Sequence, residues 1–332
     1  MQNVLMRLGM RAIARGATAT AVGLFLLGLA ARGDVLYVGS WNNGQVLAFD
    51  ASTGAFQGQF VTGGALTAPG GILFGPDGGL FVSDPQNSRV LVYNDQTGVY
   101  DHVFATGTGL RQPIIFGSGG DLFAGGTTSS GILRYDGTTG AYEGVFASTT
   151  NARAMVFGPD GNLYVSEAVP GTVTRWDGTT GAFLGTFLSG LSNPHGLTFG
   201  IDGSLYVAEY NSNRVHHYSS TGADLGLFIT GNGLNGPVGV LFGPDGDLFV
   251  SSADGSDVRR FDGTTGAFEG VVASGNGLSG AGFMTFRSTS PTNLQYNPVP
   301  EPSTGVLILV VVAALGLRPR QRCCGTTATG AT

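Results

Sequence analysis

A short apolar motif recurs at nearly constant spacing along most of this chain of 332 residues. Each copy is a leucine, then an aromatic residue, then valine or alanine, and successive copies lie 41 to 44 residues apart. The copies begin at Leu36, Leu80, Leu122, Leu163, Leu205 and Leu248. A period near 40, built from short β-branched and aromatic runs between glycine and aspartate, is typical of four-stranded propeller blades. We therefore expect an all-β repeat fold.

The sequence of every repeat predicts four strands joined by tight turns. An apolar first strand, as at 196–199, is followed by an Asp-Gly turn and the leucine-aromatic strand. A third strand ends in an aromatic residue, as at 173–176, and a fourth follows, as at 182–187. Pro-Asp-Gly turns occur at 76–78, 159–161 and 244–246. Because proline has a fixed φ and glycine accepts a positive φ, the 58 glycines indicate many hairpins rather than disorder.

The strand count predicts how the ring closes. Five complete repeats run from about residue 71 to about residue 273. The strands left over are 35–39, 45–50 and 55–61 at one end and 282–287 at the other. Together they make a sixth blade, which removes the free sheet edges that invite aggregation. We expect a six-bladed β-propeller over residues 34–288, closed by its N- and C-terminal strands.

Two local motifs look functional but fit turn chemistry better. Trp176-Asp177 has the dipeptide of WD repeats, yet sister repeats carry Tyr135-Asp136 and Phe261-Asp262 there, so the aromatic residue marks a strand end. The acidic runs 245–247 and 254–257 lack the oxygen ligands and the bidentate glutamate of an EF-hand. We expect both runs to be turns.

The segments 81–90 and 206–215, together with 69–72 and 194–197 before them, resemble NHL repeats. The resemblance extends over about residues 34–287. It implies a six-bladed propeller of a group that includes ligand-binding scaffolds and metal-dependent lactonases of the gluconolactonase type. Those lactonases need a glutamate ligand early in the first blade, where this chain has no acid after Asp34.

An apolar stretch near the N-terminus has the order of a secretory signal peptide. Arg7, Arg11 and Arg15 precede the apolar run 21–31, and small residues surround Arg32. We expect residues 1–33 to be a signal peptide that is cleaved on export. An uncleaved N-terminal anchor is the alternative.

The C-terminal segment has three parts in order. Pro300, Glu301 and Pro302 come first, and the prolines hold this motif extended. The apolar run 306–317 follows and is shorter than the ~20 residues that a membrane span prefers. Three arginines then favour retention on the cytoplasmic side: Arg318, Arg320 and Arg322.

This order resembles the PEP-CTERM sorting signal of exopolysaccharide-producing bacteria, over residues 299–322. The resemblance implies an exosortase-type processing enzyme as a partner, a precursor anchored transiently in the inner membrane by residues 306–317, and export to the cell surface or extracellular matrix. Residues 289–298 are then a linker. The tail 323–332, with Cys323 and Cys324, extends past the usual end of this signal. A plain C-terminal membrane tail is the alternative.

The expected mature domain is strongly acidic. The whole chain has a formal net charge of −6, but residues 34–299 keep nine arginines against twenty-one acids. Such a surface repels phosphate backbones, so we expect no nucleic-acid partner. Both cysteines lie beyond the C-terminal apolar run, so the domain has no disulfide available.

The residue after each second strand belongs to a ring on the face where propeller ligands usually bind. The ring is Ser40, Asp84, Gly126, Glu167, Glu209 and Ser252. Asp84 and Glu209 each have an arginine five residues on, so we expect a local ion pair across each hairpin. Glu167 has a threonine there instead, and it is the carboxylate that we expect to be free for a ligand.

The histidines do not form a zinc site in this interpretation. His195 stands alone in a loop that leads to the channel, and zinc needs three or four ligands. His216 and His217 are adjacent on a third strand, so they point to opposite faces. No Gly-x-Ser-x-Gly motif occurs in the chain.

Loop aromatic and amide side chains suit binding better than catalysis. They are Trp41, Asn42, Asn43, Asn151, Tyr210, Asn211, Asn232 and Asn235. We predict a binding or interaction module that takes a polysaccharide or protein ligand at the channel face, without a cofactor. The alternative is a secreted metal-dependent hydrolase of the lactonase type, or a lyase, with calcium or zinc held by Glu167, Glu209 and their neighbours. A purely structural matrix protein is a third hypothesis.

Overall fold

The computed structural model describes residues 34–126 and 131–287. The expected signal peptide (1–33), linker (289–298), sorting segment (299–322) and tail (323–332) lie outside the described residues. Within the described part, no helix combines the length and the apolar character that a membrane crossing needs.

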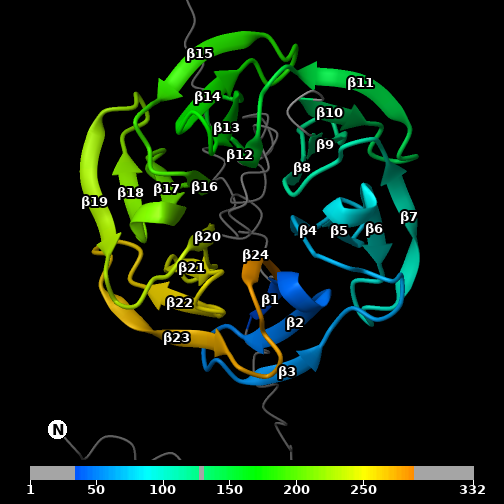
Figure 1. Ribbon diagram of the computed structural model, residues 1–332, viewed down its shortest axis with the longest axis horizontal. Helices are drawn as coiled ribbons and strands as arrows, with labels where there is room; N and C mark the ends of the chain where they lie inside the picture. The colour runs from blue at the N-terminus through cyan, green and yellow to red at the C-terminus, as the bar shows by residue number, and fades with distance from the viewer. Residues whose placement is uncertain (1–33, 127–130, 288–332) are drawn as a thin grey trace, which may run out of the picture. The chain divides into compact units, whose positions relative to one another are not determined.

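The described residues contain 24 strands in six four-stranded antiparallel sheets, which are the blades of a ring (Figure 1). Blade 1 comprises β1 (Val35–Ser40), β2 (Gln45–Asp50), β3 (Phe56–Gln59) and β24 (Ala281–Arg287). Blade 2 comprises β4 (Ile72–Phe74), β5 (Leu80–Asp84), β6 (Arg89–Tyr93) and β7 (Tyr100–Thr106). Blade 3 comprises β8 (Ile114–Phe116), β9 (Leu122–Gly125), β10 (Ile132–Tyr135) and β11 (Tyr142–Ala147).

The second half of the ring repeats this order. Blade 4 comprises β12 (Ala152–Phe157), β13 (Leu163–Glu167), β14 (Thr172–Trp176) and β15 (Phe183–Leu188). Blade 5 comprises β16 (Pro194–Phe199), β17 (Leu205–Glu209), β18 (Arg214–Tyr218) and β19 (Asp224–Thr230). Blade 6 comprises β20 (Pro237–Phe242), β21 (Leu248–Ser252), β22 (Asp257–Phe261) and β23 (Phe268–Ser274). Short 3-10 turns follow the second strands of blades 1, 2 and 5: η1 (Trp41–Asn43), η2 (Pro85–Asn87) and η3 (Tyr210–Ser212).

The last described strand closes the ring by pairing with the first. β24 is antiparallel to β1, with Phe286 opposite Leu36 and Met284 opposite Val38. This confirms the predicted closure of the sixth blade. The outermost strand of this blade, β3, is shorter than the expected 55–61, because the chain leaves blade 1 and residue Thr62 bridges to Val99, next to β7 of blade 2.

The repeated motif is explained by contacts between neighbouring blades. In every blade, the aromatic residue of the motif packs edge-on against a phenylalanine on the innermost strand of the next blade, at centroid distances of 4.9 to 5.7 Å. In blade 1 this innermost strand is β24. The pairs are Tyr37–Phe74, Phe81–Phe116, Phe123–Phe157, Tyr164–Phe199, Tyr206–Phe242 and Phe249–Phe286. Such pairs contribute beyond the apolar area that they bury.

The turns before the outer strands also join adjacent blades. In blade 4, the Asp177 carboxylate accepts hydrogen bonds from the backbone N–H groups of Thr179 and Thr180 at 3.0 and 2.7 Å. Gly181 closes this turn at a φ of +72°, and a Cβ there would lie 1.9 Å from the carbonyl oxygen of Phe146 in blade 3. Glycine is therefore required at this blade contact. Trp176 ends β14, which confirms that its dipeptide marks a strand end.

Candidate functional site

Two of the ring carboxylates are held inside their own hairpins. Asp84 is fully buried, and its Oδ2 lies 2.9 Å from Nη2 of Arg89. Glu209 is also fully buried, and its Oε2 lies 3.1 Å from Nη2 of Arg214. These contacts confirm the predicted local ion pairs.

Hydrogen bonds complete the shell around Glu209. The Ser192 backbone N–H donates to Oε2 at 2.8 Å, and Nδ1 of His216 lies 2.8 Å from Oε1. Burial by itself raises the pKa of this carboxyl, but the bonds from Arg214, Ser192 and His216 and the arginine charge outweigh burial and hold the pKa below its ordinary value. Glu209 is therefore an anion that the protein has already neutralised.

The expectation that Glu167 is free for a ligand is wrong. Its side chain is 6% exposed, and Thr172 donates a hydrogen bond of 3.1 Å to Oε2. The Thr149 hydroxyl and the Thr150 backbone N–H donate to the other oxygen, Oε1. Three neutral donors thus replace the arginine of the sister hairpins, because the loop before β12 folds over the carboxylate.

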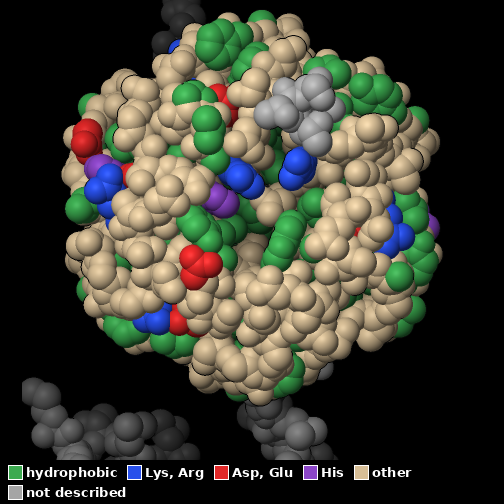
Figure 2. Space-filling model, viewed as in Figure 1, with side chains coloured by type: hydrophobic (Ala, Val, Ile, Leu, Met, Phe, Trp, Pro, Cys, Tyr) green, Lys and Arg blue, Asp and Glu red, His purple; other side chains and the backbone are tan. Residues whose placement is uncertain are grey.

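The channel mouth is lined by other residues than this ring. A cavity of about 370 Å³ is bounded by Trp41, Gln112, Arg153, His195, Tyr210 and Asp254, among others. Three predicted ligand-face residues, Trp41, His195 and Tyr210, do come together here, whereas Asp84, Glu167 and Glu209 are not part of this lining. Figure 2 shows basic side chains and a histidine gathered around the central hollow of the ring.

Farther along the channel, the lining becomes apolar. A second cavity, of about 260 Å³, is bounded by first-strand residues that include Ile72, Ile114, Met155, Leu197 and Val240. These side chains offer no hydrogen-bonding group apart from the Met155 thioether, which accepts only weakly. Polar recognition in the channel is therefore concentrated at the mouth.

His195 occupies the most enclosed polar position at the mouth. It lies on β16, is 7% exposed, and stacks on the ring of Tyr210 with centroids 5.0 Å apart and planes inclined by 27°. Its Nδ1 is buried without a hydrogen-bond partner. Burial and the nearby charge of Arg153 lower the pKa of His195 to about 3, so this imidazole is neutral at neutral pH. The Tyr210 hydroxyl donates to Oδ1 of Asp254 in blade 6 at 2.8 Å.

Sequence reasoning missed the arginines at the mouth. Arg153 and His195 each stand four residues before the phenylalanine that ends the first strand of their blade. The equivalent residues around the ring are Gly70, Gln112, Arg153, His195, Val238 and Gly282. If the repeats are aligned on this phenylalanine rather than on the second strand, Gln112, Arg153 and His195 fall at equivalent positions.

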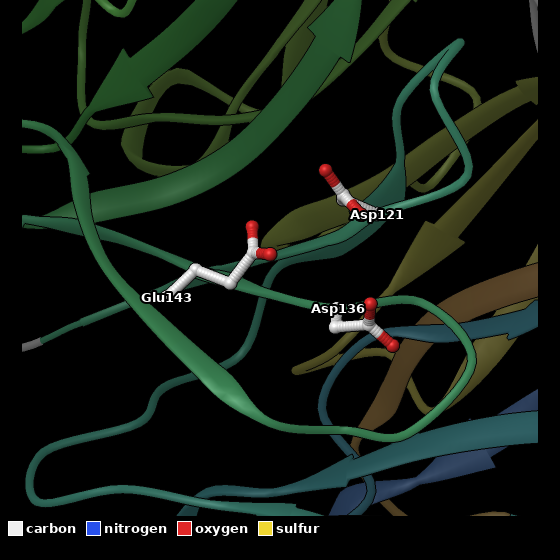
Figure 3. A group of neighbouring side chains, drawn as sticks. All are labelled: Asp121, Asp136 and Glu143. Atoms are coloured by element: carbon white, nitrogen blue, oxygen red, sulfur yellow. The ribbon is translucent and has the colours of Figure 1, made fainter.

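Two acidic clusters lie away from the channel mouth. Figure 3 shows Asp121, Asp136 and Glu143 of blade 3, whose ligand atoms all lie within 4.8 Å of one another, and Asp247, Asp262 and Glu269 form the same arrangement in blade 6. Arg134 contacts Asp121 and Glu143, and Arg260 contacts Asp247 and Glu269. The protein therefore supplies its own cation to each cluster.

No protein-family model and no curated protein matches the sequence. Solved structures resemble the fold. A chain of a nidogen/laminin complex has a TM-score of 0.64 at 17% identity, over 78% of this chain and 100% of that chain. A catalytically inactive virginiamycin B lyase from Staphylococcus aureus with quinupristin has a TM-score of 0.54 at 16% identity, over 78% and 93%. A protein of unknown function from Bacteroides caccae has a TM-score of 0.63 at 12% identity, over 76% and 98%. At these identities the likeness shows a shared propeller fold.

Proposed function

We propose that this propeller is a binding module whose ligand enters the channel mouth. The observation that carries this proposal is the composition of the cavity of about 370 Å³: two aromatic side chains, Trp41 and Tyr210, lie beside the polar groups of Gln112, Arg153 and His195. Apolar surface with a few convergent polar groups is the usual character of a ligand site.

The geometry favours binding over the metal-dependent hydrolase or lyase. That alternative relies on Glu167 and Glu209, whose oxygens accept bonds from threonine hydroxyls, from Arg214 and from His216. In the described part of the chain, the clusters able to hold an ion contain neither glutamate. One structural neighbour is a lyase and another is part of a protein complex, so the fold accommodates both activities.

The same proposal includes export. We infer that residues 1–33 direct secretion and that the Pro300-Glu301-Pro302 motif, with the apolar run behind it, is read by an exosortase-type enzyme. The support is the order of parts at each end of the sequence and its resemblance to the PEP-CTERM signal. In this proposal the released propeller acts at the cell surface or in the extracellular matrix, where a polysaccharide or protein is its ligand.

Tryptophan fluorescence provides a direct test of the binding site. The chain has two tryptophans, and Trp176 is 6% exposed in blade 4, with its Nε1 donating to Thr174 at 3.0 Å. A ligand at the mouth should therefore change the emission of Trp41 and leave Trp176 unaffected. Residues 34–287 should be titrated with soluble polysaccharides and extracellular proteins.

Two variants show whether the ligand binds at the channel mouth. Trp41→Phe should abolish the fluorescence change, and Tyr210→Ala should weaken binding at least tenfold when calorimetry measures it. A ligand that binds both variants as tightly as the original chain would place the binding site elsewhere and reject the proposal.

A further inference from the structure

The arginines at the channel mouth differ from the others in the domain. Residues 34–126 and 131–287 contain nine arginines, and six of them form ion pairs with carboxylates. Within these ranges, the other three form no such pair, and they are Arg111, Arg153 and Arg175. Arg175 hydrogen-bonds to Tyr164 instead, which leaves Arg111 and Arg153. Arg153 lines the cavity of about 370 Å³ at the channel mouth (the main cavity). Arg111 lines an adjoining cavity of about 170 Å³ that also contacts Trp41, Gln112 and Arg153.

Two buried nitrogen atoms at this place have no partner within the protein. They are Nε of Arg153 and Nδ1 of His195, and both side chains line the same cavity. Buried polar atoms in folded proteins are nearly always hydrogen-bonded, so an unpartnered pair on two side chains that line one cavity points to a ligand with acceptor atoms.

The charged side chains at the mouth indicate the sign of the charge on that ligand. The pKa of Arg153 is lowered, first by burial and then by the charge of Arg111. The pKa of His195 is likewise lowered, first by burial and then by the charge of Arg153. These like charges destabilise one another, although the chain as a whole is negative. Asp254 is the carboxylate that lines the main cavity, and it already accepts the Tyr210 hydroxyl. An anion between the arginines would relieve the repulsion.

The aromatic side chains indicate what carries the anion. The ring of Tyr210 stacks on His195, and Trp41 lines both the main and the adjoining cavity. The amide groups of Asn42 and Gln112 add neutral hydrogen-bonding groups at the same rim. A ligand with an apolar face, several hydroxyls and one oxyanion matches this set, and the cavity of about 370 Å³ suits a compact unit rather than an extended chain.

We propose that the channel mouth binds a carboxylated sugar unit of an acidic polysaccharide. The carboxylate lies between Arg153, Arg111 and His195, because the guanidinium fork matches a carboxylate in geometry and charge. The sugar ring lies against Trp41 and Tyr210, whose faces accept its apolar side. This inference rests on the proposed binding function and adds the chemical class of the ligand.

Oligogalacturonate and its methyl ester are the matched probes, because they differ in the charge of the carboxyl group and share the sugar ring. We expect oligogalacturonate to bind residues 34–287 at least tenfold more tightly than the ester in calorimetric titrations. Binding should also weaken as salt concentration rises, since ions screen the attraction. Equal affinity for the acid and the ester would overturn the proposal.

Two arginine variants connect the affinity to the site. Arg153→Gln and Arg111→Gln should each weaken binding of oligogalacturonate at least tenfold. Arg175→Gln is the control, because Arg175 lies on β14 and hydrogen-bonds to Tyr164, away from the mouth. If Arg153→Gln fails to fold, Arg111→Gln still provides the test, because Arg111 is exposed and its replacement should not disturb folding. Unchanged affinity in the folded arginine variants would reject the anion site.

The outcomes separate this inference from the binding function. If the ester binds as well as the acid and Trp41→Phe abolishes its fluorescence change, the propeller is a binding module and the anion inference fails. If polyaspartate binds in an Arg153-dependent manner and oligogalacturonate does not, the saccharide assignment is wrong. If neither saccharide nor polyaspartate changes the emission of Trp41, the inference is rejected, and the polysaccharide and protein titrations remain the test of the binding function itself.

Discussion

Leu36 and Phe286 face each other across the antiparallel pair β1–β24, and both side chains are almost completely buried, at 0% and 1% exposure. The Phe286 ring also packs on Phe249 of blade 6, with centroids 4.9 Å apart. One residue near the end of the propeller therefore contacts both the first strand of the domain and the preceding blade. We therefore expect the stability of the whole ring to depend on this contact.

Replacement of Phe286 by alanine should destabilise the propeller strongly. Removal of a buried phenylalanine typically costs about 3–5 kcal/mol in the free energy of unfolding. Urea denaturation followed by circular dichroism measures the change. Phe183→Ala is the control, because this ring on an outer strand is 56% exposed, and we expect a loss below about 1 kcal/mol. Deletion of 281–287 should lower the melting temperature still further, and an unchanged melt would count against closure by β24.

Arg214→Ala should destabilise the propeller without any metal present. Glu209 stays fully buried in the variant and loses its cationic partner, although Ser192 and His216 still bond to it. We expect the free energy of unfolding to fall by about 2–3 kcal/mol, below the ~3–5 of a completely buried pair, because the arginine is partly exposed. Arg175→Ala serves as the control. Equal stability of the two variants would show that the Glu209 pair contributes little.

Glu167→Gln tests the correction at the neighbouring hairpin. Every donor to Glu167 is neutral, so a glutamine oxygen can still accept from Thr149 and Thr150, and its NH₂ can donate to the Thr172 hydroxyl. The bonds become weaker, however, because the acceptor no longer carries the carboxylate charge. We expect a loss of about 1–2 kcal/mol in urea denaturation. The stability of this variant should respond to added calcium or zinc in the same way as that of the original chain. A metal-dependent rise in melting temperature that disappears in Glu167→Gln would instead favour the enzyme hypothesis.

The sequence predicted the fold well because its signals are local and repeated. The spacing of the leucine-aromatic motif was enough to count the blades, and a separation of five residues across a hairpin was enough to pair Asp84 with Arg89. Glu167 was misjudged because two of its donors, Thr149 and Thr150, come from a different loop. Arg153 and His195 line the same cavity because the first strands of blades 4 and 5 lie side by side around the axis. The sequence of a single repeat does not contain that information.

The proposed sorting signal predicts where the mature protein ends. In a host with an exosortase, mass spectrometry of the extracellular protein should find no peptide beyond about residue 305. Glu301→Ala should leave unprocessed precursor in the inner membrane, since the motif could no longer be recognised. Ser303→Ala, next to the motif, is the matched control and should be processed normally. Recovery of peptides that contain Cys323 and Cys324 outside the cell would reject the sorting proposal.

The buried imidazole of His195 should make the propeller less stable as the pH falls from 7 toward 5. Its folded-state pKa, lowered to about 3 by burial and by Arg153, lies below the ordinary value of 6.5. The unfolded chain therefore takes up a proton below pH 6.5 that the folded chain does not, and unfolding becomes more favourable. The slope approaches about 1.4 kcal/mol per pH unit below pH 6.5, so the loss between pH 7 and pH 5 is about 2 kcal/mol.

Urea denaturation at several pH values between 5 and 7 measures this slope, above the range where most carboxylates titrate. His195→Gln should remove most of the slope, because glutamine takes up no proton in the unfolded chain. His102→Gln is the control for the replacement of a histidine, since His102 is 53% exposed on β7. The remaining slope in His195→Gln comes partly from His217, whose pKa burial also lowers. If His195→Gln and the original chain lose stability equally between pH 7 and pH 5, the imidazole is protonated in the folded state, and its surroundings are more polar than its burial against Tyr210 and Arg153 indicates.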